Sequence, residues 1–115
     1  MRRRLAGAVL ASLAAATPAA AADEVRTVLY RCERGVDIWA SYVNTDDTSH
    51  AVIQAEGRQA ALTVQRAASG ARYAAAPGVS GYIWWTKGPK ASLAWFDAAT
   101  SEEVMLYMDC AEVEP

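Results

Sequence analysis

The sequence is poor in the side chains that most often build active sites and metal sites. It has one histidine, His50, and only two cysteines, Cys32 and Cys110, with no C-x-x-C pair. A second histidine that could complete a metal site or activate a serine is missing, and we expect His50 to be a surface or half-buried residue. The carboxylate pairs Asp46-Asp47 and Glu102-Glu103 fall in turn-like segments, where side chains are solvated rather than poised as an acid and a base. We therefore expect no enzyme activity, no metal and no cofactor.

A long apolar span is missing as well. Residues 1–22 have the pattern of a secretory signal peptide, with the positive Arg2–Arg4, the apolar Leu5–Ala16 and the small cleavage-site residues Ala20–Ala22. The apolar run is too short for a lasting transmembrane helix, and no cysteine lies near the cleavage site to accept a lipid anchor. We expect the mature chain, residues 23–115, to be a single periplasmic domain without a stable membrane anchor.

Basic residues are in the minority once the signal peptide is set aside. Without Arg2–Arg4, eight of the eleven lysines and arginines remain against thirteen acidic residues, a net charge of about −5. This balance is unfavourable for binding nucleic acid or an anionic membrane surface, and it favours a cationic partner. It does not indicate the oligomeric state.

The two cysteines lie near the two ends of the expected mature domain. In a small secreted protein such a pair most simply forms one disulfide. A Cys32–Cys110 bond would close a loop of about 79 residues and contribute roughly 4 to 5 kcal/mol by chain-entropy arithmetic, which is an upper figure. For a domain with a modest core, that is a large share of the total stability.

Short strand-like segments follow one another along the chain, with turn signals between them and no long helical window. The expected strands are 25–32, 36–43, 51–55, 60–66, 72–74, 82–86, 91–96 and 104–110. Such a series predicts an antiparallel sandwich or barrel, and we favour a small eight-stranded antiparallel β-barrel because closure removes exposed sheet edges. A helix over 59–71, where alanine is common, is the alternative for that segment.

Alternation along these segments predicts which side chains face the core. Segment 36–43 places Ile38 on one face and Trp39 on the other. The adjacent rings of Trp84 and Trp85 must likewise take opposite faces, so that one fills the interior and the other lies outside, near Lys87.

Two polar groups stand beside glycines on either side of an aromatic strand. Ser69 precedes Gly70 in the segment ASGARY, and Lys87 precedes Gly88 in the segment WTKG. Each has a plain structural explanation, since Ser-Gly is a common turn pair and lysines protect strand ends against aggregation. Their combination and order along the chain are more informative than either residue alone.

These segments, together with Tyr30-Arg31-Cys32 and the late Cys110, resemble the bacterial inhibitors of c-type lysozyme, a family of membrane-bound lipoproteins and soluble periplasmic relatives. The family pattern is roughly SASGARY, a gap, W-x-KG-x-x-A-x-L and a late cysteine, and the resemblance covers about residues 27–110. It implies an eight-stranded antiparallel barrel that inserts a loop and an adjacent strand end into the catalytic cleft of a c-type lysozyme.

The resemblance also implies a site. Ser69 and Lys87 would reach the two catalytic carboxylates of the lysozyme. The other residues expected at the lysozyme-binding site are Gly70, Ala71, Arg72, Tyr73, Thr86 and Gly88.

Three features depart from the family pattern. Ala67 replaces the first serine of SASGARY, the connection between Tyr73 and Tyr82 is longer than in the shortest members, and Lys90 stands where an acidic residue is frequent. The longer connection must loop out if Ser69 and Lys87 are to lie together.

The residues alone leave two other functions possible. One is a small-ligand-binding periplasmic β-barrel whose aromatics would line a cavity opening beside Trp84 or Trp95. The other is a purely structural domain of the cell envelope. A barrel of this size is usually filled by its own side chains, which counts against the internal pocket.

Overall fold

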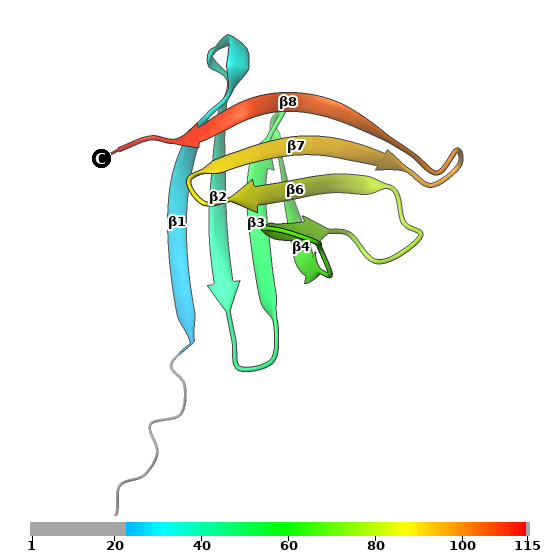
Figure 1. Ribbon diagram of the computed structural model, residues 1–115, viewed down its shortest axis with the longest axis horizontal. Helices are drawn as coiled ribbons and strands as arrows, with labels where there is room; N and C mark the ends of the chain where they lie inside the picture. Colours follow the sequence, from blue (N-terminus) through cyan, green and yellow to red (C-terminus); the bar gives the residue numbers. More distant parts are fainter. Residues whose placement is uncertain (1–22, 115) are drawn as a thin grey trace, which may run out of the picture.

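The strands follow one another around a closed barrel in the order of the sequence (Figure 1). The computed structural model describes residues 23–114, and the expected signal peptide, 1–22, lies outside the described residues. The elements are β1 (Glu24–Arg31), η1 (Glu33–Gly35, a 3₁₀ helix), β2 (Asp37–Asn44), β3 (Ser49–Ala55), β4 (Arg58–Gln65), β5 (Ala71–Ala74), β6 (Gly81–Lys87), β7 (Lys90–Asp97) and β8 (Glu102–Glu112). Each strand pairs antiparallel with the next, and β8 pairs with β1. The eight-stranded antiparallel barrel expected from the sequence is confirmed.

The barrel interior is filled by side chains that alternate along the strands. In β2, Ile38 is fully buried while its neighbour Trp39 is exposed, and in β6 Trp84 is fully buried while Trp85 is exposed. Both predictions from the two-residue period are confirmed. The largest fully buried side chains are Trp84, Tyr30, Ile38, Ile53, Leu93 and Cys110. Because they occupy the centre, the structure does not favour an internal ligand pocket.

The polar atoms of three buried aromatic residues form hydrogen bonds with one another inside the barrel. The hydroxyls of Tyr30 and Tyr42 are 2.6 Å apart, and Trp84 Nε1 donates to the Tyr42 hydroxyl at 2.9 Å. Burial raises the pKa of both tyrosines, so both remain neutral at physiological pH. These buried hydrogen bonds orient the ring of Trp84 and stiffen β6 from the inside.

The alternative of a helix over 59–71 is wrong. Residues 58–65 form β4, which pairs with β3 and β5 and directs Leu62 into the core. Pairing on both sides outweighs the modest helix preference of the alanines. The Glu56-Gly57 turn before β4 has positive φ at both residues (54° and 77°), as a tight two-residue hairpin turn requires. Within residues 23–114, no helix is long and apolar enough to cross a membrane.

The seam that closes the barrel is short. β1 and β8 share two paired positions, Tyr30 with Glu112 and Arg31 with Ala111, and the Val113 amide adds a hydrogen bond to the Leu29 carbonyl at 2.8 Å. The expected disulfide, Cys32–Cys110, lies directly beside this seam. It therefore links β1 to β8 where few backbone hydrogen bonds do so.

We expect the barrel to depend strongly on this disulfide. Changing both Cys32 and Cys110 to alanine should lower the free energy of unfolding by up to about 4 kcal/mol, because the unfolded chain regains the freedom of the opened loop. Urea unfolding followed by tryptophan fluorescence measures the loss. A reducing agent should destabilise the wild type similarly and leave the double variant unchanged. Equal urea midpoints for the variant and the oxidised wild type would contradict this role.

Candidate functional site

The segments that carry Ser69 and Lys87 lie side by side at one end of the barrel. β5 pairs with β6 in the register Ala71 with Thr86 and Arg72 with Trp85. Because the strands are antiparallel, the chain just before β5 and the chain just after β6 lie at the same end of the pair. Ser69, Lys87 and Gly88 are exposed there. The structure thus brings together the two groups that the sequence singled out.

The backbone at Ser69-Gly70 is held against β6 by a close approach. Trp85 Nε1 donates to the Ser69 carbonyl oxygen at 2.9 Å. Gly70 has a φ of +68°, and a Cβ at this position would overlap the carbonyl oxygen of Thr86. Glycine is therefore required here for two reasons, the left-handed backbone and the lack of space.

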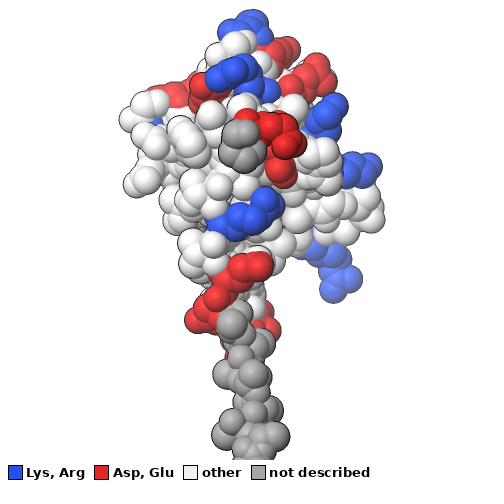
Figure 2. Space-filling view, turned by 90° about the vertical axis from the view of Figure 1, so that its left-hand side faces the viewer, with Lys and Arg blue, Asp and Glu red and all other residues white. Residues whose placement is uncertain are grey.

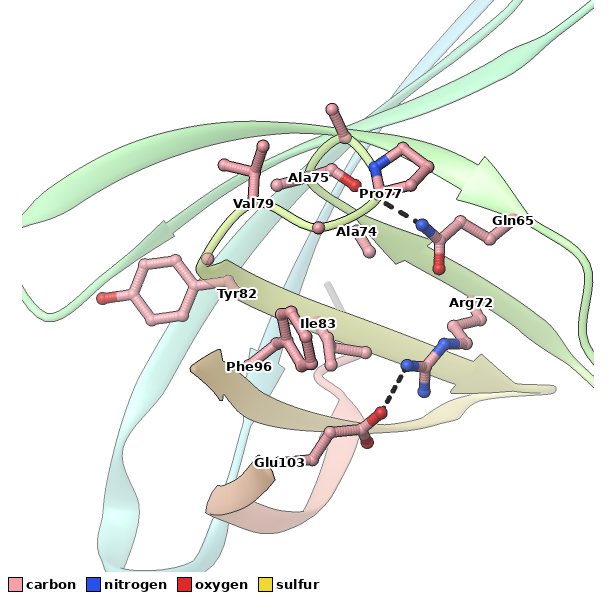
Figure 3. A pocket seen from close by; sticks show the side chains of 13 residues that line it. Gln65, Arg72, Ala74, Ala75, Pro77, Val79, Tyr82, Ile83, Phe96 and Glu103 are labelled. Carbon is pink, nitrogen blue, oxygen red and sulfur yellow. Dashed lines mark hydrogen bonds and ion pairs between the residues drawn. The ribbon is translucent and has the colours of Figure 1, made fainter. Parts of the chain in front are cut away.

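Arg72 ties this loop to a third strand. Its guanidinium carbon lies 5.7 Å from the ring centroid of Trp85, and its Nη2 is 2.7 Å from Glu103 Oε2 (Figure 3). Its side chain is 20% exposed, so it is largely packed rather than free. The sequence placed Glu103 in a turn, but it lies at the start of β8 and pairs with Phe96 of β7. The continuous apolar run 104–108 indicated a strand, but no sequence signal extended that strand back to Glu103.

Tyr73 is the one buried residue among the expected contact residues. It is only 7% exposed and faces the barrel interior, where its ring centroid lies 5.7 Å from that of Tyr42. Burial raises the pKa of its hydroxyl. Strand alternation turns Arg72 outward and Tyr73 inward, so Tyr73 supports the loop from below.

The longer connection after β5 loops out without disturbing the register. Residues 75–80 fold back over the outer face of β5 and β6 around a pocket of about 140 Å³ (Figure 3). Gln65 Nε2 donates to the Ala75 carbonyl at 3.4 Å, and the Ser80 hydroxyl accepts from the Ala98 amide at 2.8 Å. Ala74, the last residue of β5 before this connection, is still paired with Ile83 of β6. The insertion therefore leaves Ser69 and Lys87 together.

Two lysines flank the tip of the next hairpin. Lys87 and Lys90 are direct cross-strand partners on either side of Gly88-Pro89, and both are exposed. Neither forms an ion pair within residues 23–114. Two like charges placed opposite each other repel, which leaves this tip suited to an anionic partner.

The remaining expected contact residues frame this end of the pair. Thr86 and Ala71 are half-buried cross-strand partners whose side chains share the inward face. His50 is half-buried, one of the two positions expected from the sequence, and its Nδ1 lies 3.1 Å from the Thr63 hydroxyl. Within residues 23–114, no three histidine, cysteine, aspartate or glutamate side chains gather as a metal site would require.

These features define a class of protein, a small disulfide-linked β-barrel with an exposed loop and a hairpin tip side by side at one end. The family model described as membrane-bound lysozyme-inhibitor of c-type lysozyme matches residues 30–102, and the chain belongs to this family. It is a family of inhibitor proteins and not of enzymes.

Relatives agree with this assignment. The membrane-bound lysozyme inhibitor of C-type lysozyme from Cupriavidus necator is 36% identical over 96 residues, covering 75% of this chain and 74% of the relative. The protein with the same description from Pseudomonas aeruginosa is 39% identical over 79 residues, covering 68% of this chain and 59% of the relative.

Two solved structures resemble the barrel. Pseudomonas aeruginosa MliC, crystallised in complex with hen egg white lysozyme, has a TM-score of 0.63 and 33% identity over 92% of this chain and 98% of that chain. PliC-St, the periplasmic lysozyme inhibitor of C-type lysozyme from Salmonella typhimurium, has a TM-score of 0.66 and 25% identity over 79% of this chain and all of that chain.

The close approach at Gly70 gives a matched test. Gly70→Ala should lower the urea midpoint well beyond Gly78→Ala, because both positions have positive φ but a Cβ at Gly78 meets nothing within 4 Å. The control should lose about 1 to 2 kcal/mol from backbone strain alone. Gly70→Ala should lose more or displace the loop, which would also change the fluorescence of Trp85. Equal losses of stability in the two variants would contradict the close packing of Gly70 against the Thr86 carbonyl.

Proposed function

We propose that this protein inhibits c-type lysozyme by placing Ser69 and Lys87 at the two catalytic carboxylates. The observation that carries the proposal is the β5–β6 register, which puts both residues at one exposed end of the barrel. Membership of the inhibitor family supports it, as does the fold shared with an inhibitor crystallised on hen egg white lysozyme.

The chemistry of the two sides is complementary. A retaining glycosidase carries two carboxyl groups about 5 Å apart, one an acid of raised pKa and one ionised. The Lys87 ammonium can form charge-assisted hydrogen bonds with both, and the Ser69 hydroxyl can donate or accept beside it. Removal of water from the cleft strengthens these bonds, and good geometry is needed to offset the desolvation of the ammonium.

The neighbouring residues hold this pair in place. Gly70 permits the close approach to Thr86, and Arg72 packs on the Trp85 ring whose indole N–H is bonded to the Ser69 carbonyl. Ala71, Thr86 and Gly88 complete the proposed interface. A contact loop that is ordered before binding loses less conformational entropy when the complex forms.

Net charge acts at longer range. The mature domain carries an excess of acidic residues, which suits association with a basic lysozyme and acts mainly on the association rate. On the face shown in Figure 2, basic and acidic side chains are interspersed rather than gathered into one field. Lys87 and Lys90, as cross-strand partners, bring two cations together at the hairpin tip, where they would meet the acidic cleft.

We expect Lys87→Ala to weaken inhibition of hen egg white lysozyme by about 30-fold or more, as for loss of one member of a buried charge pair. Ser69→Ala should weaken it about tenfold, as for a hydrogen bond to a charged group. Inhibition constants from lysis of a peptidoglycan substrate measure both effects.

The matched control is Arg58→Ala, which removes an exposed cation at the start of β4. It should inhibit like the wild type, and circular dichroism should show that all three variants are folded. A folded Lys87→Ala variant with wild-type inhibition would refute the proposed mechanism.

The same proposal includes the mature form and its location. The family includes membrane-bound and periplasmic inhibitors, and this chain belongs with the soluble periplasmic ones because its signal peptide pattern, 1–22, lacks a lipid-accepting cysteine. Residues 23–115 then form the inhibitor domain.

Fractionation of expressing cells checks this location. The protein should appear in the soluble periplasmic fraction with the intact mass of a chain that starts near Asp23. Recovery in the membrane fraction, or retention of the first 22 residues, would contradict it.

A further inference from the structure

A groove of about 300 Å³ lies on the outer face of β6, β7 and β8, directly beside Lys87. We call it the lysine–methionine groove. It is formed by Trp85, Lys87, Lys90, Ser92, Met105 and Met108. It shares Lys87 with the site proposed above and continues from it across the sheet.

Side-chain size along the strands explains why the surface is hollow. Ser92 of β7 is the cross-strand partner of Trp85 of β6, so a small side chain lies between a large ring and the methionines of β8. The register of β7 and β8 shifts on both sides of Leu93, and Asp109, which also lines the groove, has a φ of +55°. A bulge of this kind bends and twists β8 locally, beside the groove.

The walls are apolar although they face water. Trp85 is 38% exposed, Met105 48% and Met108 49%. One exposed apolar residue needs no explanation, but three around a single hollow mark a contact surface. Methionine is flexible and polarizable, and tryptophan and methionine are enriched at protein interfaces.

The charges at the groove indicate what kind of partner fits. Lys87 and Lys90 stand at its edge without an ion pair within residues 23–114, against the single carboxylate of Asp109. A partner should therefore offer apolar surface next to carboxylates. The cleft of a c-type lysozyme has this combination, because its catalytic acid lies in a hydrophobic pocket against a tryptophan.

We propose that the lysine–methionine groove is a second contact surface for the same lysozyme and receives an apolar side chain from the lip of the catalytic cleft. This inference rests on the proposed function, since Lys87 would anchor the cleft beside the groove. Lys90 then acts as a second cation toward the cleft rim.

Substitution of both methionines tests the proposal. Met105→Ser/Met108→Ser should weaken binding to hen egg white lysozyme at least tenfold, measured by calorimetry, because apolar contact area is lost. The matched control is Val104→Ser, which changes an equally exposed apolar residue of β8 that does not line the groove. It should bind like the wild type, and urea midpoints should show that all variants are folded.

A second measurement needs no variant. Met1 lies in the expected signal peptide, so Met105 and Met108 are the methionines of the mature domain. Dilute hydrogen peroxide transfers one oxygen to each exposed thioether, giving the sulfoxide and water. Bound lysozyme should slow this oxidation at least severalfold by peptide mass spectrometry, and the oxidised inhibitor should bind more weakly.

The outcomes separate the two proposals. If Lys87→Ala loses inhibition while the double methionine variant binds like the wild type and lysozyme does not protect the methionines, the groove proposal is overturned and the proposed function stands. If the wild type neither binds nor inhibits lysozyme, both fail. A third outcome is that the wild type self-associates in ultracentrifugation, the double variant does not, and both bind lysozyme equally well. In that case a second copy of the chain covers the groove, and the proposal is again overturned.

Discussion

Closure of the barrel between β1 and β8 is the constraint on which the rest of the structure depends. Only two residue pairs join these strands, and the Cys32–Cys110 disulfide lies beside them. β8 supplies Glu103, which binds Arg72, and both methionines of the lysine–methionine groove. Cys110 pairs with Ala91, next to Lys90, so the disulfide lies at the same end of the barrel as the hairpin tip and keeps in place the strand that supports the proposed contacts. The chain-entropy effect of so long a loop makes one covalent bond sufficient for a small core.

Trp85 connects the two parts of the proposed interface. Its indole N–H holds the Ser69 carbonyl, its ring lies beside the Arg72 guanidinium, and the same ring forms one wall of the groove. Trp84, turned inward by strand alternation, is fixed from the other side by its bond to Tyr42. The two adjacent tryptophans thus support β6 from both faces, and Lys87 extends from a strand with little freedom to move.

Much of this arrangement could be predicted from residue patterns. Alternation in 36–43 and the repeated short strands with turn signals between them indicated an eight-stranded barrel, and the two cysteines indicated its disulfide. The inward turn of Tyr73 and the strand position of Glu103 could not be predicted in this way. They depend on the register of β5 with β6 and of β7 with β8, and pairing partners distant in sequence decide that register.

The sequence by itself determined the local chemistry of this protein: a hydroxyl and an ammonium beside glycines, two adjacent rings on opposite faces, and a cysteine pair near the domain ends. These follow from bonding geometry within a few residues. Only the tertiary structure decided that Ser69 and Lys87 share one end of the barrel, that Gly70 has no room for a Cβ, and that Met105 and Met108 lie across a hollow from Trp85. The reason is that cross-strand pairing, bulges and side-chain packing join segments whose sequence separation carries no information about distance.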